Sequence, residues 1–239
     1  MFDTPPRAVL LDAGETLLYA PPSTSAIAAA VAGEAGLPFT AAEVHAAWNG
    51  VEPEAQTRID AGERSTLSTE RSQRFWFWFY GRLLTKLGVP QGRHIALASA
   101  FYERFTTLDT WDLYDDALVC LNQLRQAGVT LALVSNWESW LESLLHHRQI
   151  HHYFDALAIS GQVGAEKPDA AIFHAALGQS GASAEEAVHV GDSVASDVEG
   201  ARAVGIRPVL LDRSRSLAPQ PDVPILHSLT DLPALLGLA

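Results

Sequence analysis

Polar residues follow four short apolar runs of this 239-residue chain. AVLL at 8–11 precedes an Asp, VTLALV at 129–134 precedes a Ser-Asn pair, and AVHV at 187–190 precedes GDSVASD. The run FDALAIS at 154–160 is followed a few positions later by a Lys-Pro pair. The residues concerned are Asp12, Ser135, Asn136, Lys167, Asp192 and Asp197. Carboxylate oxygens suit hard divalent cations, whereas ammonium and hydroxyl groups bind anions, so this set could hold both.

Each of these residues also has a purely structural explanation when it is considered alone. Asp12, Ser135 and either later Asp are good helix N-caps, and Lys167 could be a solvated loop charge. Together, however, three carboxylates and one cation at a single edge are costly unless a metal and an anion neutralise them. Only two of the 16 Lys and Arg residues are lysines. A lysine at 167 therefore indicates that this position requires the compact charge of an ammonium group, which arginine does not supply.

The elements that must position these residues alternate between strand and helix. The four runs, together with RPVLL at 207–211, are short enough for buried parallel strands, and amphipathic or capped stretches lie between them. One such stretch begins with Pro168 in its expected first turn, and Ser228 is expected to cap the last helix. The pattern predicts an α/β fold with a doubly wound, Rossmann-like parallel sheet. Ligands of such sheets bind at the carboxyl ends of the strands, where the polar residues lie.

The segment from 19 to 109 breaks this alternation. Four stretches, at 26–37, 41–50, 72–88 and 93–105, have helical period or propensity, and no convincing strand is present. We therefore expect an inserted α-helical domain at 19–109 and a core formed by 1–18 and 110–239. The aromatic run RFWFWFY at 74–80 is expected mainly to fill the interior of the insert.

Bulk properties exclude several classes of protein. A net charge of −12 opposes binding to nucleic acid, which depends on Lys and Arg displacing counterions. The chain lacks an apolar run of the roughly 20 residues that a membrane helix needs, and the opening MFDTPPR is not a signal peptide. The prediction is a cytoplasmic protein that contacts no membrane. The single Cys120 is expected to be inert on the buried face of a helix.

Four motifs stand in a recognisable order: DxxxT at 12–16, SN at 135–136, KP at 167–168 and GDxxxxD at 191–197. This set resembles the haloacid dehalogenase superfamily, in the branch of phosphatases that carry a helical cap after the first strand. The resemblance spans nearly the whole chain, although the insert matches only in being helical and of suitable length.

The resemblance implies a nucleophile and a metal site. Asp12 would attack a phosphoryl group to give an aspartyl-phosphate, with Mg²⁺ held by Asp12, the backbone carbonyl of Gly14 and Asp192. Asp197 would lie near the metal and bind it through water. Magnesium suits this role because it bridges carboxylate to phosphate and cancels their repulsion.

The same resemblance assigns the phosphate contacts. Thr16, Ser135 and the amide of Asn136 would hold the phosphoryl oxygens, and Lys167 would offset charge on the nucleophile and the transferring group.

The sequence departs from the family at Gly14, where the phosphatases carry a second Asp that protonates the leaving oxygen. Positioned acid–base catalysis contributes about 10²- to 10⁴-fold, so its loss raises the barrier by about 3 to 5 kcal/mol and predicts slow turnover of alkyl phosphates. The catalytic candidate Glu15, an acid from the cap, or a leaving group that needs no proton would each compensate. A residue next to Gly14 in an extended segment points the other way, which counts against Glu15.

The predicted function is therefore a slow, magnesium-dependent hydrolase of small phosphorylated metabolites, either monomeric or homodimeric. A 2-haloacid dehalogenase-like hydrolase is the first alternative, because halide leaves without a proton. Asp192 and Asp197 oppose it, since they would repel a carboxylate substrate. A catalytically weak phosphate-binding or regulatory protein is the second alternative.

The stretch HHRQIHH places His147 and His151 at i, i+4 spacing, which suits a transition metal if the segment is helical. A solvent-exposed helix end is the favoured interpretation, because we expect no acid or Cys nearby to complete a site.

Overall fold

The computed structural model describes residues 4–218 and 220–238. The chain forms two compact units. A core unit comprises Met1–Tyr19 and Leu113–Ala239, and a helical unit comprises Ala20–Asp112. These boundaries lie within a few residues of those expected from the sequence.

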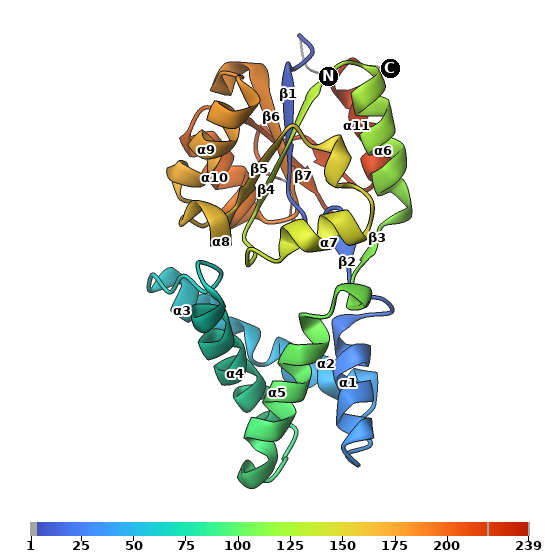
Figure 1. Ribbon diagram of the computed structural model, residues 1–239, viewed down its shortest axis with the longest axis vertical. Coiled ribbons are helices and arrows are strands. Elements are labelled where there is room, and N and C mark those ends of the chain that lie inside the picture. The colour runs from blue at the N-terminus through green and yellow to red at the C-terminus, as the bar shows by residue number, and fades with distance from the viewer. Residues whose placement is uncertain (1–3, 219, 239) are drawn as a thin grey trace. The chain divides into compact units, whose positions relative to one another are not determined.

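A six-stranded parallel sheet with the order β5-β4-β1-β6-β7-β8 forms the centre of the core unit (Figure 1). The predicted α/β, doubly wound architecture is confirmed. Leu11 is in register with Leu133 on one side and Val190 on the other, so the chain leaves these three strands at the same edge. The strands are β1 (Ala8–Leu11), β4 (Thr130–Ser135), β5 (Ala156–Ile159), β6 (Ala187–Gly191), β7 (Arg207–Leu211) and β8 (Ile225–Leu226).

Helices cover both faces of the sheet, with α9 and α10 on one face and α6 and α11 on the other (Figure 1). Ile172 and Phe173 of α9 pack against alanine and valine side chains of β1, β4 and β5. Cys120 is buried on α6, as predicted. The α-helices of this unit are α6 (Asp115–Gln126), α7 (Leu141–His147), α8 (Ser160–Val163), α9 (Ala170–Ser180), α10 (Glu199–Ala203) and α11 (Leu232–Leu235). Single turns of 3₁₀-helix lie at His151–Tyr153, Ala184–Glu186 and Leu229–Asp231, and a π-helical turn lies at Val194–Val198.

Two predicted helix starts can be compared with the structure. Pro168 was expected in the first turn of its helix, but α9 begins at Ala170, because the Asp169 side chain accepts a hydrogen bond from Ala171 N (2.9 Å) and caps the helix. The expectation for Pro168 is therefore wrong. Ser228 does cap the last helical segment, since its side chain accepts from Thr230 N at 3.2 Å.

The helical unit has an aromatic interior. Trp48 lies 4.7 Å from Phe79, and Tyr80 lies 5.3 Å from Phe101, measured between ring centroids. The aromatic residues at 75–80 belong to this cluster, Phe75, Phe79 and Tyr80 as buried members and the other three packed against it, which confirms that the run mainly fills the interior. The helices are α1 (Thr24–Glu34), α2 (Ala41–Asn49), α3 (Glu52–Asp60), α4 (Thr69–Lys86) and α5 (His94–Phe105), with 3₁₀ turns at Gln91–Arg93 and Leu108–Thr110.

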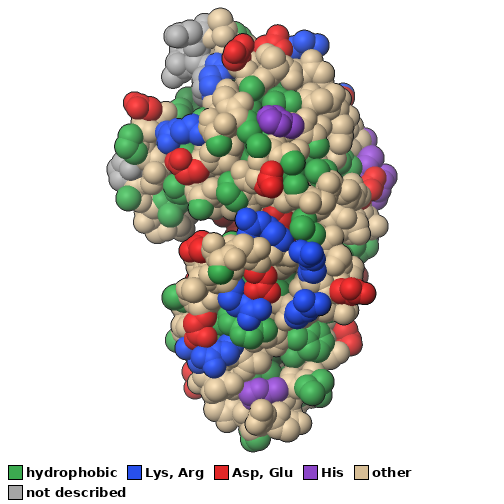
Figure 2. All heavy atoms as spheres, turned by 90° about the vertical axis from the view of Figure 1, so that its left-hand side faces the viewer, with side chains coloured by type: hydrophobic (Ala, Val, Ile, Leu, Met, Phe, Trp, Pro, Cys, Tyr) green, Lys and Arg blue, Asp and Glu red, His purple; other side chains and the backbone are tan. Residues whose placement is uncertain are grey.

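The sequence did not predict α3, because EPEAQTRID is polar and only Ala55 of this helix is buried. Acidic and basic side chains are interspersed over the surface of the helical unit in the lower half of Figure 2. Arg82 and Glu54 of this unit form one exposed ion pair, with 2.8 Å between Nε and Oε2.

The chain leaves and re-enters the core unit through the two-stranded sheet of β2 (Leu18–Tyr19) and β3 (Asp112–Leu113). Among the described residues, no helix combines the length and apolarity needed to cross a membrane.

Candidate active site

Three carboxylates converge at the carboxyl ends of β1 and β6. Asp12 directly follows β1, Asp192 follows β6, and Asp197 lies in the π-helical turn after it. One oxygen from each of the three lies within 4.8 Å of the others. The common edge of the parallel sheet therefore brings together acidic residues that are 180 positions apart in the sequence.

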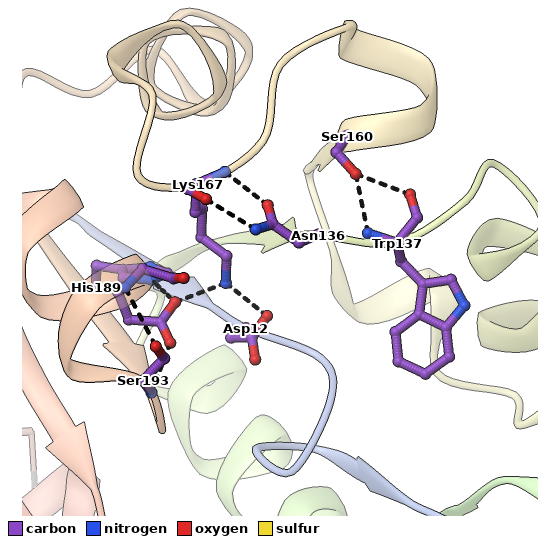
Figure 3. A network of polar contacts seen from close by, with 9 residues as sticks. Asp12, Asn136, Trp137, Ser160, Lys167, His189 and Ser193 are labelled. Carbon is purple, nitrogen blue, oxygen red and sulfur yellow. Dashed lines mark hydrogen bonds and ion pairs between the residues drawn. The ribbon is translucent and has the colours of Figure 1, made fainter. Parts of the chain in front are cut away.

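Lys167 lies between two of these carboxylates (Figure 3). Its Nζ donates to Asp12 Oδ1 at 2.6 Å and to Asp197 Oδ1 at 2.6 Å. The side chain of Lys167 is only 3% exposed, and its two partners are nearly as buried. One buried cation thus faces three acidic groups.

Burial and charge shift the pKa values of these groups in different directions. Burial disfavours the charge on Lys167, but the carboxylates of Asp12 and Asp197 outweigh burial and raise its pKa. Burial likewise opposes the charge of Asp197, yet Lys167 and His189 lower its pKa. Burial, assisted by the charge of Asp197, raises the pKa of Asp12. Burial and then the two neighbouring carboxylates raise the pKa of Asp192 to about 8. The ammonium group of Lys167 therefore does not neutralise the negative charge of all three carboxylates.

Asn136 holds the main chain of Lys167 in place. Its Oδ1 accepts from Lys167 N at 2.6 Å, and its Nδ2 donates to Lys167 O at 2.9 Å (Figure 3). The side chain of Asn136 therefore positions the main chain of Lys167. Ser135, the last residue of β4, is 1% exposed and lines the same cavity.

Two residues that support Asp197 were not identified from the sequence. His189 Nε2 lies 2.8 Å from Asp197 Oδ1, and Ser193 N donates to Asp197 Oδ2 at 2.9 Å. A Cβ on Gly191 would lie 2.2 Å from Asp197 Cγ, so only glycine fits beside this carboxylate. The signal in the sequence was the histidine inside the otherwise apolar run AVHV, because a buried polar side chain requires a hydrogen-bond partner.

The cavity at this edge has a volume of about 210 Å³. That is below the usual range for drug-sized ligands, so it suits a small polar group and the first atoms attached to it. It is lined by Asp12, Gly14, Ser135, Asn136, Trp137, Lys167, Asp192, Ser193, Ser196 and Asp197.

Two of the predicted site residues, Thr16 and Glu15, are not among those that line this cavity. The Thr16 hydroxyl is fully buried and has no hydrogen-bond partner in the described part of the chain. Glu15 has a left-handed backbone with φ of 51°, and its Oε2 accepts from the Tyr114 hydroxyl at 2.7 Å. Glu15 lines a neighbouring cavity, together with Asp192 and Arg213.

The chemistry of the donor set fits a magnesium ion. Asp12 and Asp192 offer carboxylate oxygens, and the backbone carbonyl of Gly14 belongs to a residue of the same cavity. Both Asp197 oxygens already accept hydrogen bonds, so an indirect contact through water suits this residue better. Hard oxygen ligands with room for water are the environment that Mg²⁺ prefers.

Comparison with known proteins gives family and fold. A family model described as haloacid dehalogenase-like hydrolase matches residues 6–205. Haloacid dehalogenase-like hydrolase domain-containing protein 3 of Danio rerio is 30% identical over 237 residues, covering 97% of this chain and 97% of that protein. A phosphoserine phosphatase of Thermus thermophilus is 39% identical over 127 residues, covering 53% of this chain and 49% of that protein. The chain thus aligns with about half the length of that phosphatase.

Two solved structures share the fold over nearly the whole chain. The HAD-hydrolase YfnB of Bacillus subtilis, bound to magnesium, has a TM-score of 0.79 at 18% identity, with 98% of this chain and 99% of that chain covered. A 2-haloacid dehalogenase of Pseudomonas syringae has a TM-score of 0.63 at 21% identity, with 97% and 98% covered. Identities this low establish a common fold and leave the reaction open.

Proposed function

The chain belongs to the haloacid dehalogenase-like hydrolase family, and we propose that it is a slow, magnesium-dependent phosphatase of small phosphorylated metabolites. The observation that carries the proposal is a group of three carboxylates at the edge of the sheet where such folds bind ligands, two of them buried and bonded to Lys167. This arrangement is unfavourable without ligands, and a divalent cation with a phosphoryl group would neutralise it.

In the proposed mechanism, Asp12 attacks phosphorus and the leaving oxygen departs with the electrons of its bond. Lys167 offsets the negative charge of the nucleophile and of the transferring group, since its ammonium lies 2.6 Å from Asp12 Oδ1. The hydroxyl of Ser135 and the backbone amide of Asn136 would hold the phosphoryl oxygens. Thr16 would join them only after a local rearrangement, because its hydroxyl is buried.

Magnesium would be held by Asp12, the Gly14 carbonyl and Asp192, with Asp197 acting through water, and would supply charge neutralisation between carboxylate and phosphate. In the second step, water attacks the phosphoryl group on Asp12, phosphate is released and the free carboxylate is restored. The placement of Glu15 against Tyr114 does not favour it as the proton donor for the leaving group. We therefore propose low rates for substrates whose leaving group needs a proton.

The helical unit is proposed to act as a cap that selects the substrate, as its position in the sequence after the first strand suggests. Names of relatives support the reaction class, because several are phosphatases of small metabolites, such as ribulose-1,5-bisphosphate 5-phosphatase. Because these relatives act on different substrates, none of those substrates can be assigned to this chain. A cytoplasmic location and a monomeric or homodimeric state remain predictions.

The test is a screen of generic phosphate monoesters with and without Mg²⁺, with Asp12→Asn as the control. We expect phosphate release that requires Mg²⁺ and is lost in Asp12→Asn. Trapping of a phosphorylated chain, absent from the variant, would show the covalent step. Release that persists without Asp12 would contradict the mechanism.

A dehalogenase remains the alternative enzyme, because Gly14 places no acid beside Asp12 and halide needs none. Halide release from a short 2-haloacid without added metal, together with inactivity toward phosphate esters, would establish it. If neither reaction occurs and a phosphate analogue with Mg²⁺ still raises the melting temperature, the chain is a phosphate-binding protein.

A further inference from the structure

We propose that Trp137 forms the wall that receives the leaving group, and that the preferred substrates carry a planar leaving group that departs as a stable anion, such as an aryl or enol oxygen. This inference rests on the phosphatase function proposed above and names its substrate class.

The first observation is the contact between Trp137 and Gly14. A Cβ added to Gly14 would lie 3.3 Å from Cζ3 of the Trp137 ring, and both residues line the cavity that contains Asp12. The indole therefore borders the space that a side chain at position 14 would occupy. In Figure 3, Asp12 lies between Lys167 and this indole.

The second observation is that Trp137 is held firmly. Trp137 N donates to Ser160 Oγ at 2.9 Å, and the same hydroxyl donates back to Trp137 O at 3.0 Å (Figure 3). A Cβ on Gly161 would lie 2.6 Å from Ser139 N, so the two segments pack closely. The Trp140 ring meets the indole edge to face, with 5.4 Å between centroids. The main-chain contacts hold the segment that carries the indole, and the Trp140 ring packs against the indole itself.

The third observation concerns proton donors. The titratable side chains among the described lining residues are Asp12, Lys167, Asp192 and Asp197. In the proposed mechanism Asp12 is the nucleophile and Asp192 a metal ligand, while Lys167 and Asp197 are bonded to each other. None of the four is positioned as a separate acid for the leaving group.

An indole donates no proton but stacks on planar groups. When Asp12 forms its bond to phosphorus, the bond to the leaving oxygen breaks and the oxygen keeps the electron pair. An aryl or enol oxygen stabilises that charge by delocalisation, whereas an alkoxide does not. Water then hydrolyses the aspartyl-phosphate, and its protons pass to phosphate and solvent. The indole wall and the lack of a separate acid among the described residues that line this cavity thus favour the same substrates.

Phenyl phosphate and cyclohexyl phosphate make a matched test, because they differ little in size but greatly in planarity and leaving-group acidity. With Mg²⁺, we expect kcat to be at least about 100-fold higher for phenyl phosphate, the lower end of what a positioned acid contributes. Trp137→Ala should raise KM for phenyl phosphate about three- to tenfold and change that for cyclohexyl phosphate less, and Trp137→Phe should restore it.

Similar kcat values for the two esters, with both activities lost in Asp12→Asn, would overturn this inference and leave the proposed function intact. Equal effects of Trp137→Ala on both substrates would also overturn it. If no ester at all is hydrolysed, the proposed function fails and this inference fails with it.

An independent observation on α7 points to a second metal site, for a transition ion such as Zn²⁺, formed by Glu142, His146 and His151. One ligand atom of each lies within 4.8 Å of the others, and His151 Nε2 is 3.5 Å from Glu142 Oε1. The expectation that no acid lies near this stretch of histidines is therefore wrong, and the cluster contains His146 in place of His147, because α7 ends at His147 and His151 is not on the same helix. It failed because Glu142 lies one helical turn before His146, while His151 returns to the pair from the 3₁₀ turn at His151–Tyr153.

Two His and one Glu form a common ligand set for zinc with an open fourth position. Gln162 Nε2 donates to Glu142 Oε2 at 2.7 Å, an outer contact of the kind that orients metal-binding carboxylates. The rings of His146 and His151 are stacked, with 3.8 Å between centroids and 13° between planes. One imidazole ring must turn so that a nitrogen of each histidine faces the same ion, and His146 is the exposed one of the two.

Zinc titration of the metal-free protein by calorimetry, in excess Mg²⁺ to fill the acidic site, tests this inference. We expect one Zn²⁺ per chain and a higher melting temperature. His146→Ala and His151→Ala should each weaken binding at least about tenfold, as loss of a ligand contact predicts, while the neighbouring His147→Ala and the active-site Asp192→Asn should leave it unchanged. Absence of binding, or equal loss in His147→Ala, would overturn the site.

Discussion

The two units of this protein differ in what they bury: both have ion pairs at the surface, but the core unit also buries a group of charged side chains. In the core unit, Lys167, Asp12 and Asp197 form ion pairs with side chains that are less than one-tenth exposed. In the helical unit, the interior is aromatic and ion pairs such as Arg82–Glu54 lie at the surface, with 46% and 35% of the side chains exposed. Buried charge costs folding free energy, whereas buried aromatic surface supplies it. The contrast indicates that the core edge is built for a ligand and the helical interior for stability.

The largest expected effect comes from removing the buried ammonium group of Lys167. Lys167→Met leaves Asp12 and Asp197 without their counter-ion, so the free energy of unfolding should fall by about 3 to 5 kcal/mol in the absence of Mg²⁺. The value of kcat for aryl phosphates should fall by about 10²- to 10³-fold, as when an electrostatic contact to the transition state is lost. Urea denaturation and steady-state kinetics measure the two effects. Asp12→Asn, which removes a negative charge and keeps Lys167 paired with Asp197, is the stability control and should differ little from the parent.

Truncation in the helical interior should affect stability alone. Phe101 is 1% exposed and packs against Tyr80, so Phe101→Ala should lower the free energy of unfolding by about 3 to 5 kcal/mol through lost contacts and a cavity. Per folded molecule, kcat for phenyl phosphate should stay close to that of the parent. A loss of kcat as large as that of Lys167→Met would show that the helical interior also contributes to activity and would contradict this comparison of the two units.

Adding an acid at position 14 sharpens the comparison inside the core unit. A positioned acid typically raises a rate by about 10²-fold or more. Gly14→Asp should raise kcat for cyclohexyl phosphate by less than this, because the new side chain meets the Trp137 ring. Gly14→Asp combined with Trp137→Leu should give the larger gain. An intact fold with no gain in either variant would show that the missing acid does not limit the rate.

The smallest effect is expected at the helical surface. Arg82→Gln breaks the pair with Glu54, but water and salt already screen these exposed groups, so the melting temperature should barely change. Calorimetry at low and high salt measures it. A shift comparable to that of Lys167→Met would mean that the burial of an ion pair does not govern its effect in this protein.

Much of the core unit could be predicted because its strands are short apolar runs whose polar residues come at the carboxyl ends. AVLL, VTLALV and AVHV appear in the structure as β1, β4 and β6 with little change in their bounds. The register of β1 with both neighbours then brings Asp12 close to Asp192 and Asp197. Helix α3 was missed because a polar helix with one buried residue has no apolar period to detect.

The sequence by itself determined which strands form and which chemical groups stand at their ends, because apolar period and residue type are local properties. Only the tertiary structure decided which partners those groups have. The pairing of His189 with Asp197, the contact of Trp137 with Gly14 and the turn of Glu15 toward Tyr114 join residues from different elements. Such contacts depend on side-chain direction and close packing across the sheet edge, which spacing along one chain does not encode.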